Sequence, residues 1–199
     1  VQRGARLDYL GMNFDFGCKG EVKITMFDQI KKILLEYPDA LRNKKLSSPN
    51  TDKLFEVRKE IKPLDEERAK TFHRLVAQLL YIIKRARPDL APAVPFLTTR
   101  VCSPNEDDWK KLRNVIEYLS QTWAMPLILK GDRNKPPTWS IDAAYSVHGD
   151  CKSHTGASFT MGAGSVFTVS CKQKVNTKSS TEAELVAVDD CIGHVLRIR

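Results

Sequence analysis

Two carboxylates in this chain have a setting that suits metal-assisted hydrolysis of a phosphodiester. Asp142 lies in the middle of an alternating segment, 139–147, and Glu184 lies near the start of the last predicted helix, with a predicted β-hairpin between them. A nuclease that uses two metal ions needs several carboxylates to hold them against the scissile phosphate. Asp189 and Asp190 share the helix of Glu184 and are poor substitutes for a ligand on another element. The pair therefore predicts the beginning of a metal site rather than all of it.

The strand predicted around Asp142 puts small side chains on the same face, namely Ser140, Ala144 and Ser146. Successive side chains of a strand point to opposite faces, so the larger residues of this segment face away. The small neighbours leave space for a metal ion and a phosphate. The alternative is an ordinary solvent-facing aspartate, since surface aspartates are common.

Glu184 competes with a nearby glutamate for a structural role. Ser179 and Glu182 have the spacing of a capping box, in which the glutamate folds back on the first turn. Glu184 would then lie about 200° further round the helix, free for another role. A competing box of Thr181 with Glu184 would make Glu184 structural; we favour the first arrangement.

Basic side chains offer contacts for the phosphates of a nucleic acid, whose binding is sequence-independent and salt-dependent. The lysines near the acidic pair are Lys172, Lys174 and Lys178. Those on or near the predicted helices are Lys84, Arg85, Arg87, Lys110, Lys111 and Arg113, with Arg68 and Arg74 on the same side. The alternative is that these charges only solvate helix surfaces and a strand end.

Composition points in the same direction. The chain has 199 residues and a net charge of +8, with a pI near 9.3, which favours polyanionic partners, nucleic acid first. No apolar run reaches the ~20 residues of a membrane span, and no signal sequence is visible. The five cysteines are scattered and never form a CxxC pair, which argues against zinc and for an intracellular protein with free thiols, cytoplasmic or nuclear.

The predicted elements fall into stretches of different period. Residues 6–25 alternate like a hairpin around a turn at 17–20, and 27–37 have helical spacing. Residues 39–63 are polar and read as a linker or long loop. Residues 64–121 read as helices, of which the second contains Pro92 and Pro95 and should start late or kink.

The third helix is predicted to open with a capping box over 103–106. From residue 123 the period changes to two: a short strand at 127–129, the strand of Asp142, and a hairpin of 155–161 with 165–171. The final helix follows Ser179. Together these elements predict an α+β protein.

Several segments of this sequence, taken in order, closely resemble copia-type retrotransposon polyproteins, over the end of the reverse transcriptase and the start of its RNase H domain. The segments are Tyr9-Leu10-Gly11-Met12, Arg74 to Tyr81, Arg87-Pro88-Asp89, Trp109 to Leu112, Tyr118-Leu119, Asp142-Ala143, and Lys172-Gln173 through Ser179 to Leu185. The resemblance covers nearly the whole chain. The Arg-Pro-Asp and Ser-Ser-Thr-Glu-Ala-Glu segments are specific together and weak singly.

The resemblance implies a layout and roles. Residues 1–38 would be the end of the palm, with a primer-grip-like hairpin at Tyr9, Leu10, Gly11 and Met12, and 39–63 a linker. Residues 64–122 would be a thumb-like helical bundle, and 123–199 a truncated RNase H-like mixed sheet with one helix. Asp142 and Glu184 would be its first two catalytic carboxylates, binding Mg²⁺.

Two hypotheses about function follow. The first is part of an enzyme that copies RNA into DNA and degrades the RNA of RNA–DNA hybrids by two-metal hydrolysis, inactive as this chain alone. The polymerase Asp-Asp motif is expected before Val1 and the later RNase H carboxylates after Arg199. The second is a non-catalytic, basic nucleic-acid-binding module, or the remnant of a decayed element. Expected partners are an RNA–DNA hybrid or template–primer duplex and the remainder of the polyprotein, with no membrane.

Overall fold

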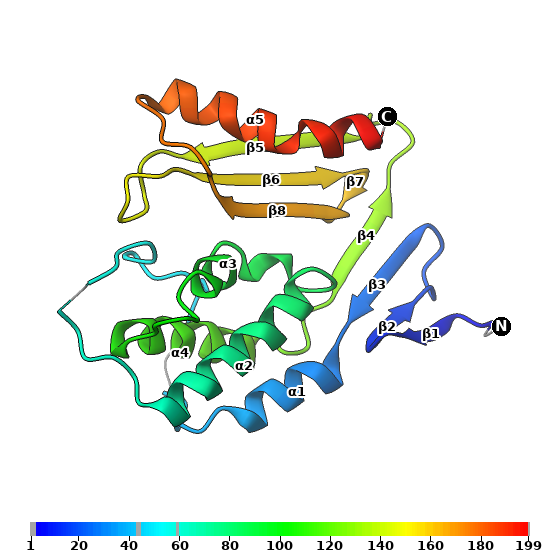
Figure 1. Ribbon diagram of the computed structural model, residues 1–199. Coiled ribbons are helices and arrows are strands. Elements are labelled where there is room, and N and C mark those ends of the chain that lie inside the picture. The colour runs from blue at the N-terminus through cyan, green and yellow to red at the C-terminus, as the bar shows by residue number, and fades with distance from the viewer. Residues whose placement is uncertain (1–2, 43–44, 59, 199) are drawn as a thin grey trace.

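The computed structural model describes residues 3–42, 45–58 and 60–198. Its first sheet has five strands in the order β1-β2-β3-β4-β7. The strands are β1 (Arg6–Tyr9), β2 (Met12–Asp15), β3 (Glu21–Thr25), β4 (Leu127–Gly131) and β7 (Gly162–Ala163). All four pairings are antiparallel. The sheet therefore draws its strands from three separate parts of the chain (Figure 1).

The N-terminal segment contains two turns where the sequence predicts one. Tyr9 pairs with Met12, so Leu10 and Gly11 form a two-residue loop, and both have positive φ, 50° and 74°. Such loops match the twist of the strands that they join. A leucine in a left-handed conformation carries no turn signal, which is why the single hairpin predicted over 6–25 is wrong.

Five helical segments that precede β4 form most of the core. They are α1 (Phe27–Glu36), α2 (Glu66–Ile83), the 3-10 helix η1 (Pro88–Leu90), α3 (Ala93–Thr98) and α4 (Glu106–Gln121). The side chains of Trp109, Leu112, Ile116 and Leu119 in α4 are buried. They belong to the apolar core cluster of the described residues.

The prolines and caps of these helices follow local rules. Pro92 precedes α3 and Pro95 lies in its first turn, where a backbone N–H has no helical partner to lose; the predicted late start is confirmed. The cap of α4 is shifted by two residues from the prediction. Asn105 is the N-cap and closes a capping box with Asp108, so the box predicted over 103–106 is wrong.

The polar segment 39–63 lies against α4 rather than standing apart from the helices. The Arg42 guanidinium pairs with Glu117 at 2.6 Å, and the Asn114 side chain donates to Pro49 O at 2.9 Å. Glu117 is 1% exposed, so this pair is shielded from water on the carboxylate side. Composition predicts a polar segment but not the long-range contacts that hold it.

The second sheet has three antiparallel strands in the order β5-β6-β8. They are β5 (Thr138–Ala144), β6 (His154–Thr160) and β8 (Phe167–Lys172), followed by α5 (Ser180–Arg197). α5 lies along β5 and β6 (Figure 1), while α3 contacts β8 from the helical region. The α+β class is thus confirmed. No crossover helix lies between β5 and β6 or between β6 and β8, and the described sheet is antiparallel rather than mixed.

No helix in the described part of the chain is long and apolar enough to cross a membrane.

Candidate functional site

The strand and the helix that carry the two carboxylates meet at the edge of the second sheet. β5 is an edge strand, and Asp142 is exposed on it. Glu184 is half-buried on α5, and its Oε1 accepts a hydrogen bond from the backbone N–H of Ala143 at 3.3 Å. The structure therefore brings the Glu184 carboxylate to the residue next to Asp142.

The first turn of α5 settles which glutamate caps the helix. Ser179 is the N-cap, and its Oγ accepts from the N–H of Glu182 at 3.2 Å. Glu182 folds back so that its carboxylate accepts from the Lys178 N–H at 2.7 Å. The predicted cap at Ser179 is confirmed, but the return bond from Glu182 goes to the Lys178 N–H and not to the Ser179 N–H as a capping box requires. Among the described residues, Glu184 makes no bond to the cap.

Asp142 lines a cavity between the second sheet and the helical region. The cavity has a volume of about 270 Å³, and its polar lining includes Asp142, His154 and Ser170, with Phe55 and Pro92 opposite. Within the described residues the Asp142 carboxylate makes no hydrogen bond or ion pair. An exposed, unpartnered carboxylate is available to an incoming ligand.

The donor set at this edge suits a hard divalent cation. Mg²⁺ prefers carboxylate oxygens and completes an octahedron with waters and substrate phosphates. Among the described residues, however, no group of three or more His, Cys, Asp or Glu is placed to hold a metal ion. Asp142 and Glu184 are therefore two candidate ligands for such a cation, fewer than a complete site needs.

A buried pair of histidines lies beside this cavity, and no sequence pattern pointed to it. His148 Nε2 and His154 Nδ1 are 3.1 Å apart, and His154 Nε2 lies 2.8 Å from Ser170 Oγ. Phe55 packs against both rings. Burial lowers the pKa of His154 to about 4 and also lowers the pKa of His148, so both rings are neutral at pH 7.

Three of the basic residues assigned to nucleic acid are engaged within the protein. Arg87 is 1% exposed and pairs with Asp89 at 2.7 Å. Lys111 is 5% exposed and donates to Glu56 O at 2.5 Å. The structure corrects their predicted role, because a buried, paired cation cannot reach a phosphate.

Arg113 is the third engaged cation. Its guanidinium donates to Asp39 at 2.8 Å and to the Tyr37 hydroxyl at 3.1 Å, and these contacts raise the pKa of Arg113. Lys172 is partly engaged, since it pairs with Asp150 at 2.7 Å and thereby lowers the pKa of that carboxyl. Both side chains are thus engaged in ion pairs within the protein.

The remaining basic candidates are more open. Lys84, Lys110, Lys174 and Lys178 are exposed, and Arg85 is half-buried over the Tyr81 ring. Lys84 ends α2 and lines a small cavity with residues 165–168. The charges of Lys84 and Lys174 lower the pKa of the Cys171 thiol, but burial has the larger effect and raises this pKa. The end of α2 and the end of β8 thus place two lysines around the same strand.

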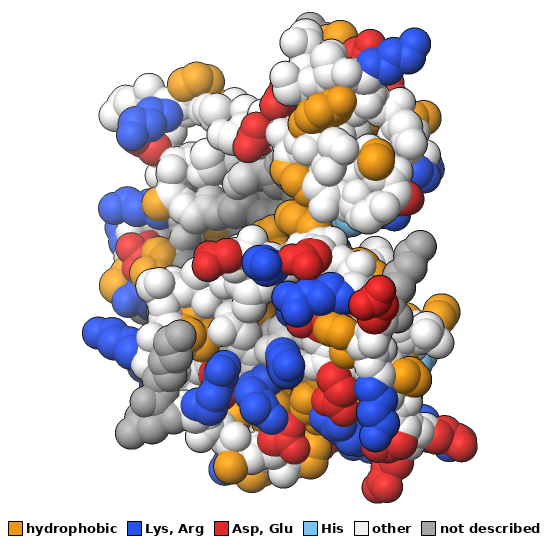
Figure 2. Space-filling model, turned by 90° about the vertical axis from the view of Figure 1, so that its left-hand side faces the viewer, with side chains coloured by type: hydrophobic (Ala, Val, Ile, Leu, Met, Phe, Trp, Pro, Cys, Tyr) orange, Lys and Arg blue, Asp and Glu red, His pale blue; other side chains and the backbone are white. Residues whose placement is uncertain are grey.

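Charge on the helical region is interleaved rather than uniform. Figure 2 shows Lys and Arg side chains mixed with Asp and Glu over this part of the face, below a hollow. Exposed pairs of opposite charge occur in this part of the chain, among them Lys70 with Glu66 and Arg58 with Glu56. An unmixed basic stripe is not what this face presents.

The residues compared to a primer grip form the tip of the first hairpin. Tyr9 and Leu10 are 64% and 57% exposed, and the Tyr81 hydroxyl donates to Leu10 O at 2.8 Å. Gly11 completes the turn and Met12 begins β2 half-buried. The tip is therefore tied to α2 while its side chains face outward.

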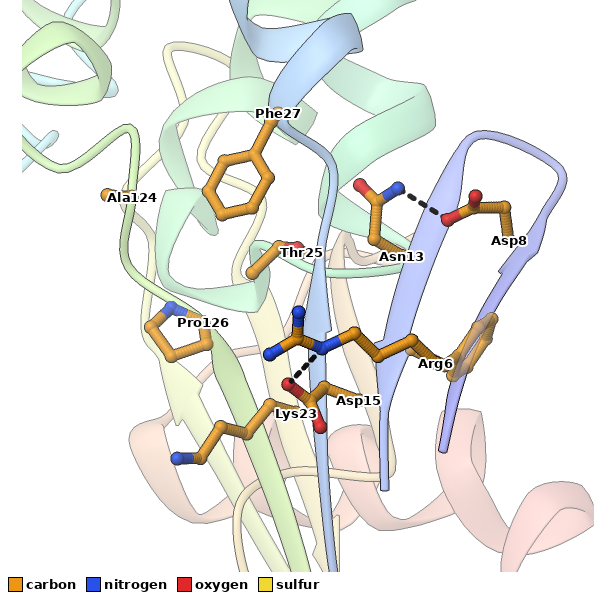
Figure 3. Close-up of a pocket in the computed structure, with 10 residues that line it drawn as sticks. Arg6, Asp8, Asn13, Asp15, Lys23, Thr25, Phe27, Ala124 and Pro126 are labelled. Atoms are coloured by element: carbon orange, nitrogen blue, oxygen red, sulfur yellow. Dashed lines mark hydrogen bonds and ion pairs between the residues drawn. The ribbon is translucent and has the colours of Figure 1, made fainter. Parts of the chain in front are cut away.

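A larger cavity lies beside this hairpin. Its volume is about 560 Å³, and strands β1 to β3 line one side while Phe27, Ala124 and Pro126 close the other (Figure 3). Four of its polar residues pair with one another: Arg6 with Asp15 at 3.3 Å, and Asn13, which donates to Asp8 at 2.7 Å. Sequence reasoning missed this cavity, because its lining comes from segments over 100 residues apart.

Among the known proteins to which the chain is similar are the following three. The chain is 27% identical over 196 residues to the putative transposon Ty5-1 protein of Saccharomyces cerevisiae, covering 94% of this chain and 60% of that protein. It is 30% identical over 122 residues to the retrovirus-related Pol polyprotein from transposon TNT 1-94 of Nicotiana tabacum, covering 58% of this chain and 9% of that protein. It is 31% identical over 117 residues to the secreted RxLR effector protein 161 of Plasmopara viticola, covering 58% of this chain and 82% of that protein.

The chain thus spans less than two thirds of the length of the first two relatives. No family model matches the chain, and no solved structure matches it.

Proposed function

We propose, from the premise that this chain belongs to the copia-type retrotransposon polyproteins, that its C-terminal unit supplies two carboxylates of an RNase H site. In this proposal Asp142 and Glu184 contribute to binding Mg²⁺ and to hydrolysing the RNA strand of an RNA–DNA hybrid. The observation that supports it is the bond from Ala143 N–H to Glu184 Oε1, which holds the Glu184 carboxylate against the backbone of the residue that follows Asp142.

The two carboxylates would divide the work. Glu184 is held by the backbone of β5, so its position is fixed before a ligand arrives. Asp142 has no partner in the described part of the chain, so its oxygens are open to a cation. Mg²⁺ held by these carboxylates would supply a Lewis acid for activating water and for stabilising the leaving oxygen.

The same proposal assigns the exposed lysines to the substrate backbone. Lys84 and Lys174 lie around β8, and their phosphate contacts would place a duplex without reading its sequence. By family likeness the N-terminal hairpin would grip a primer end and the helices would follow the duplex. These polymerase-related roles belong to the longer protein and are part of the proposal.

A metal titration of the full chain tests the site. We expect Mg²⁺, or Mn²⁺ used as a paramagnetic probe, to perturb the amide signals of Ala143 and Glu184, and Asp142→Asn to abolish the effect. The matched control is Asp189→Asn, which removes an exposed carboxylate on α5, the helix of Glu184, and should leave the effect intact. Equal responses in both variants would refute the metal assignment.

Cleavage of an RNA–DNA hybrid by the chain alone should be slight. Two carboxylates leave most of the coordination of two Mg²⁺ ions to other ligands. Robust cleavage that Asp142→Asn removes would show that the chain needs no further carboxylates. Hybrid binding with no metal-dependent change at Ala143 would instead favour the non-catalytic binding module.

A further inference from the structure

A buried glutamine that carries no assigned role lies between β6 and the turn of α5 that carries Glu184. Gln173 follows β8 and is 1% exposed. Its Nε2 donates to Ala183 O at 2.9 Å and to Thr155 Oγ1 at 3.2 Å. Its own backbone N–H donates to Ser153 O at 2.9 Å. The side chain thus connects β6 with the first turns of α5 from a fixed point on the sheet.

These contacts close a ring around the candidate site. Thr155 is the cross-strand partner of Ala143, whose N–H donates to Glu184. Glu184 follows Ala183 in α5, and Ala183 accepts from Gln173. Every link from β5 through β6 to α5 and back is therefore a backbone pairing, a covalent bond or a hydrogen bond.

The ring has a second attachment further along the helix. Thr155 Oγ1, which accepts from Gln173, also donates to Asp190 Oδ2 at 2.8 Å. Ala183 and Asp190 are seven residues apart, nearly two turns, so they lie on the same side of α5 about 10 Å apart. Two attachments at that spacing oppose both sliding and rotation. A slip of one residue would turn Glu184 by about 100° away from Ala143.

Stability alone gives no reason for an amide at this place. Gln173 Oε1 is buried without a hydrogen-bond partner in the described residues, and an unsatisfied buried polar atom is unfavourable. Both acceptors of its N–H groups have other bonds: Thr155 has Asp190, and Ala183 O lies inside a helix, where carbonyls accept from the fourth residue on. An apolar side chain would avoid the orphan atom.

We propose that Gln173 is a positioning residue for the Asp142–Glu184 site, whose carboxamide fixes the register of α5 on the sheet so that Glu184 meets Ala143. That this register serves a metal site rests on the proposed function. That Gln173 fixes the register rests on the hydrogen-bond ring alone. It requires two donors on one side chain, which methionine and glutamate lack and which asparagine carries on a shorter stem.

Amide hydrogen exchange of the full chain tests the ring without any metal or activity. We expect Gln173→Met to lower the protection of the Ala143 amide at least 10-fold while the Ala187 amide in α5 changes less than 3-fold. Gln78→Met is the matched control, because Gln78 is half-buried and also has an orphan Oε1; it should leave Ala143 unchanged. Gln173→Asn, which keeps an amide, should fold and still lower Ala143 protection, and it serves if the methionine variant fails to fold.

A parallel Mn²⁺ titration links the ring to the site. Gln173→Met should weaken Mn²⁺ broadening at Ala143 at least 10-fold, and Gln78→Met should not. Unchanged Ala143 protection in both Gln173 variants would overturn the positioning role. If protection falls as expected but wild-type protein shows no Mn²⁺ effect at all, the positioning role stands and the proposed metal function fails.

Discussion

Lys110 and Lys111 are neighbours in sequence, yet α4 turns them into opposite environments. Lys110 is exposed, whereas Lys111 is 5% exposed and lies among Asp107, Glu56 and the Phe96 ring. A step of one residue in a helix is a turn of about 100°. The pair therefore separates charge that serves the fold from charge that faces solvent.

We expect Lys111→Met to lower the free energy of unfolding by about 1–3 kcal/mol, because Asp107 and Glu56 O would be left without their partner in a shielded place. Lys110→Met should stay within about 0.5 kcal/mol of the wild type. Urea unfolding followed by circular dichroism measures both. Equal effects in the two variants would contradict the buried role of Lys111.

The histidine pair predicts a pH dependence of stability. The pKa of His154 is about 4 in the folded protein against an ordinary value of 6.5, so the unfolded chain binds more protons between these values. The free energy of unfolding should therefore fall as the pH is lowered from about 6.5 to 4, by roughly 3 kcal/mol for this group at most.

Urea titrations at pH 7 and pH 5 check this expectation. His154→Gln should flatten the difference, while His73→Gln, at an exposed histidine on α2, should retain it. A wild type with equal stability at both pH values would refute the assignment.

Charge type could be predicted for these residues, but not their burial. Arg87, Lys111 and Arg113 lie in sequence patterns that read as a basic helix surface, and their partners include Thr122, Glu56 and Asp39, 35 to 74 residues away. Only the packing of distant segments decides whether a cation faces water. Asp142 and Glu184 were easier, because strand alternation and the cap at Ser179 are local signals.

Among elements, the ends of α2 and β8 carry the two lysines that the proposed function assigns to phosphate contacts. Lys84 and Lys174 are exposed there, and the charges of both lower the pKa of Cys171. Neither depends on a buried partner. They are therefore the lysines whose removal should affect binding without affecting the fold.

Replacing Lys84 and Lys174 together with glutamine should reduce the salt slope of duplex binding by up to ~2 units, at about 0.9 for each phosphate that is no longer neutralised. Filter binding at several salt concentrations measures the slope. Lys70→Gln, at the opposite end of α2 and 74% exposed, is the control and should leave it unchanged. An unchanged slope in the double variant would move the binding surface elsewhere.

Elements themselves divided into those with local signals and those without. The helices α1, α2 and α4 follow from apolar spacing and acidic first turns. The membership of β4 and β7 in the first sheet does not, because β4 pairs with β3 across more than 100 residues and with β7 across more than 30, and such pairings leave no mark in a short window of sequence. The loop at Leu10 was missed for the related reason that its conformation is imposed by the strands on either side.

At the scale of the whole molecule, one short strand joins the two sheets. β7 lies between β6 and β8 in sequence but pairs with β4 of the first sheet. Gly164, just after it, has φ +74°, and a Cβ there would lie 2.0 Å from Ile128 O. No side chain larger than hydrogen fits that contact.

Gly164→Ala should therefore break the joint and destabilise the protein by about 3 kcal/mol or more, with separate unfolding transitions for the two parts. Gly193→Ala is the matched control, since a Cβ on this α5 residue meets nothing within 4 Å; it should stabilise by up to about 1 kcal/mol. Calorimetry distinguishes one transition from two. A single, unshifted transition in Gly164→Ala would show that β7 does not couple the sheets.

The pairing of β3 with β4 also sets an order of events during synthesis on the ribosome. Glu21 to Ile24 emerge long before their partners Leu127 to Lys130, and at 5–20 residues per second the interval is on the order of ten seconds. During that time β3, at one edge of the nascent β1-β2-β3 sheet, lacks its partner β4 and can pair with a strand of another chain. The helical region must fold in the meantime and deliver β4 to the waiting edge, so synthesis speed through residues 26–126 becomes a determinant of how much nascent protein escapes aggregation.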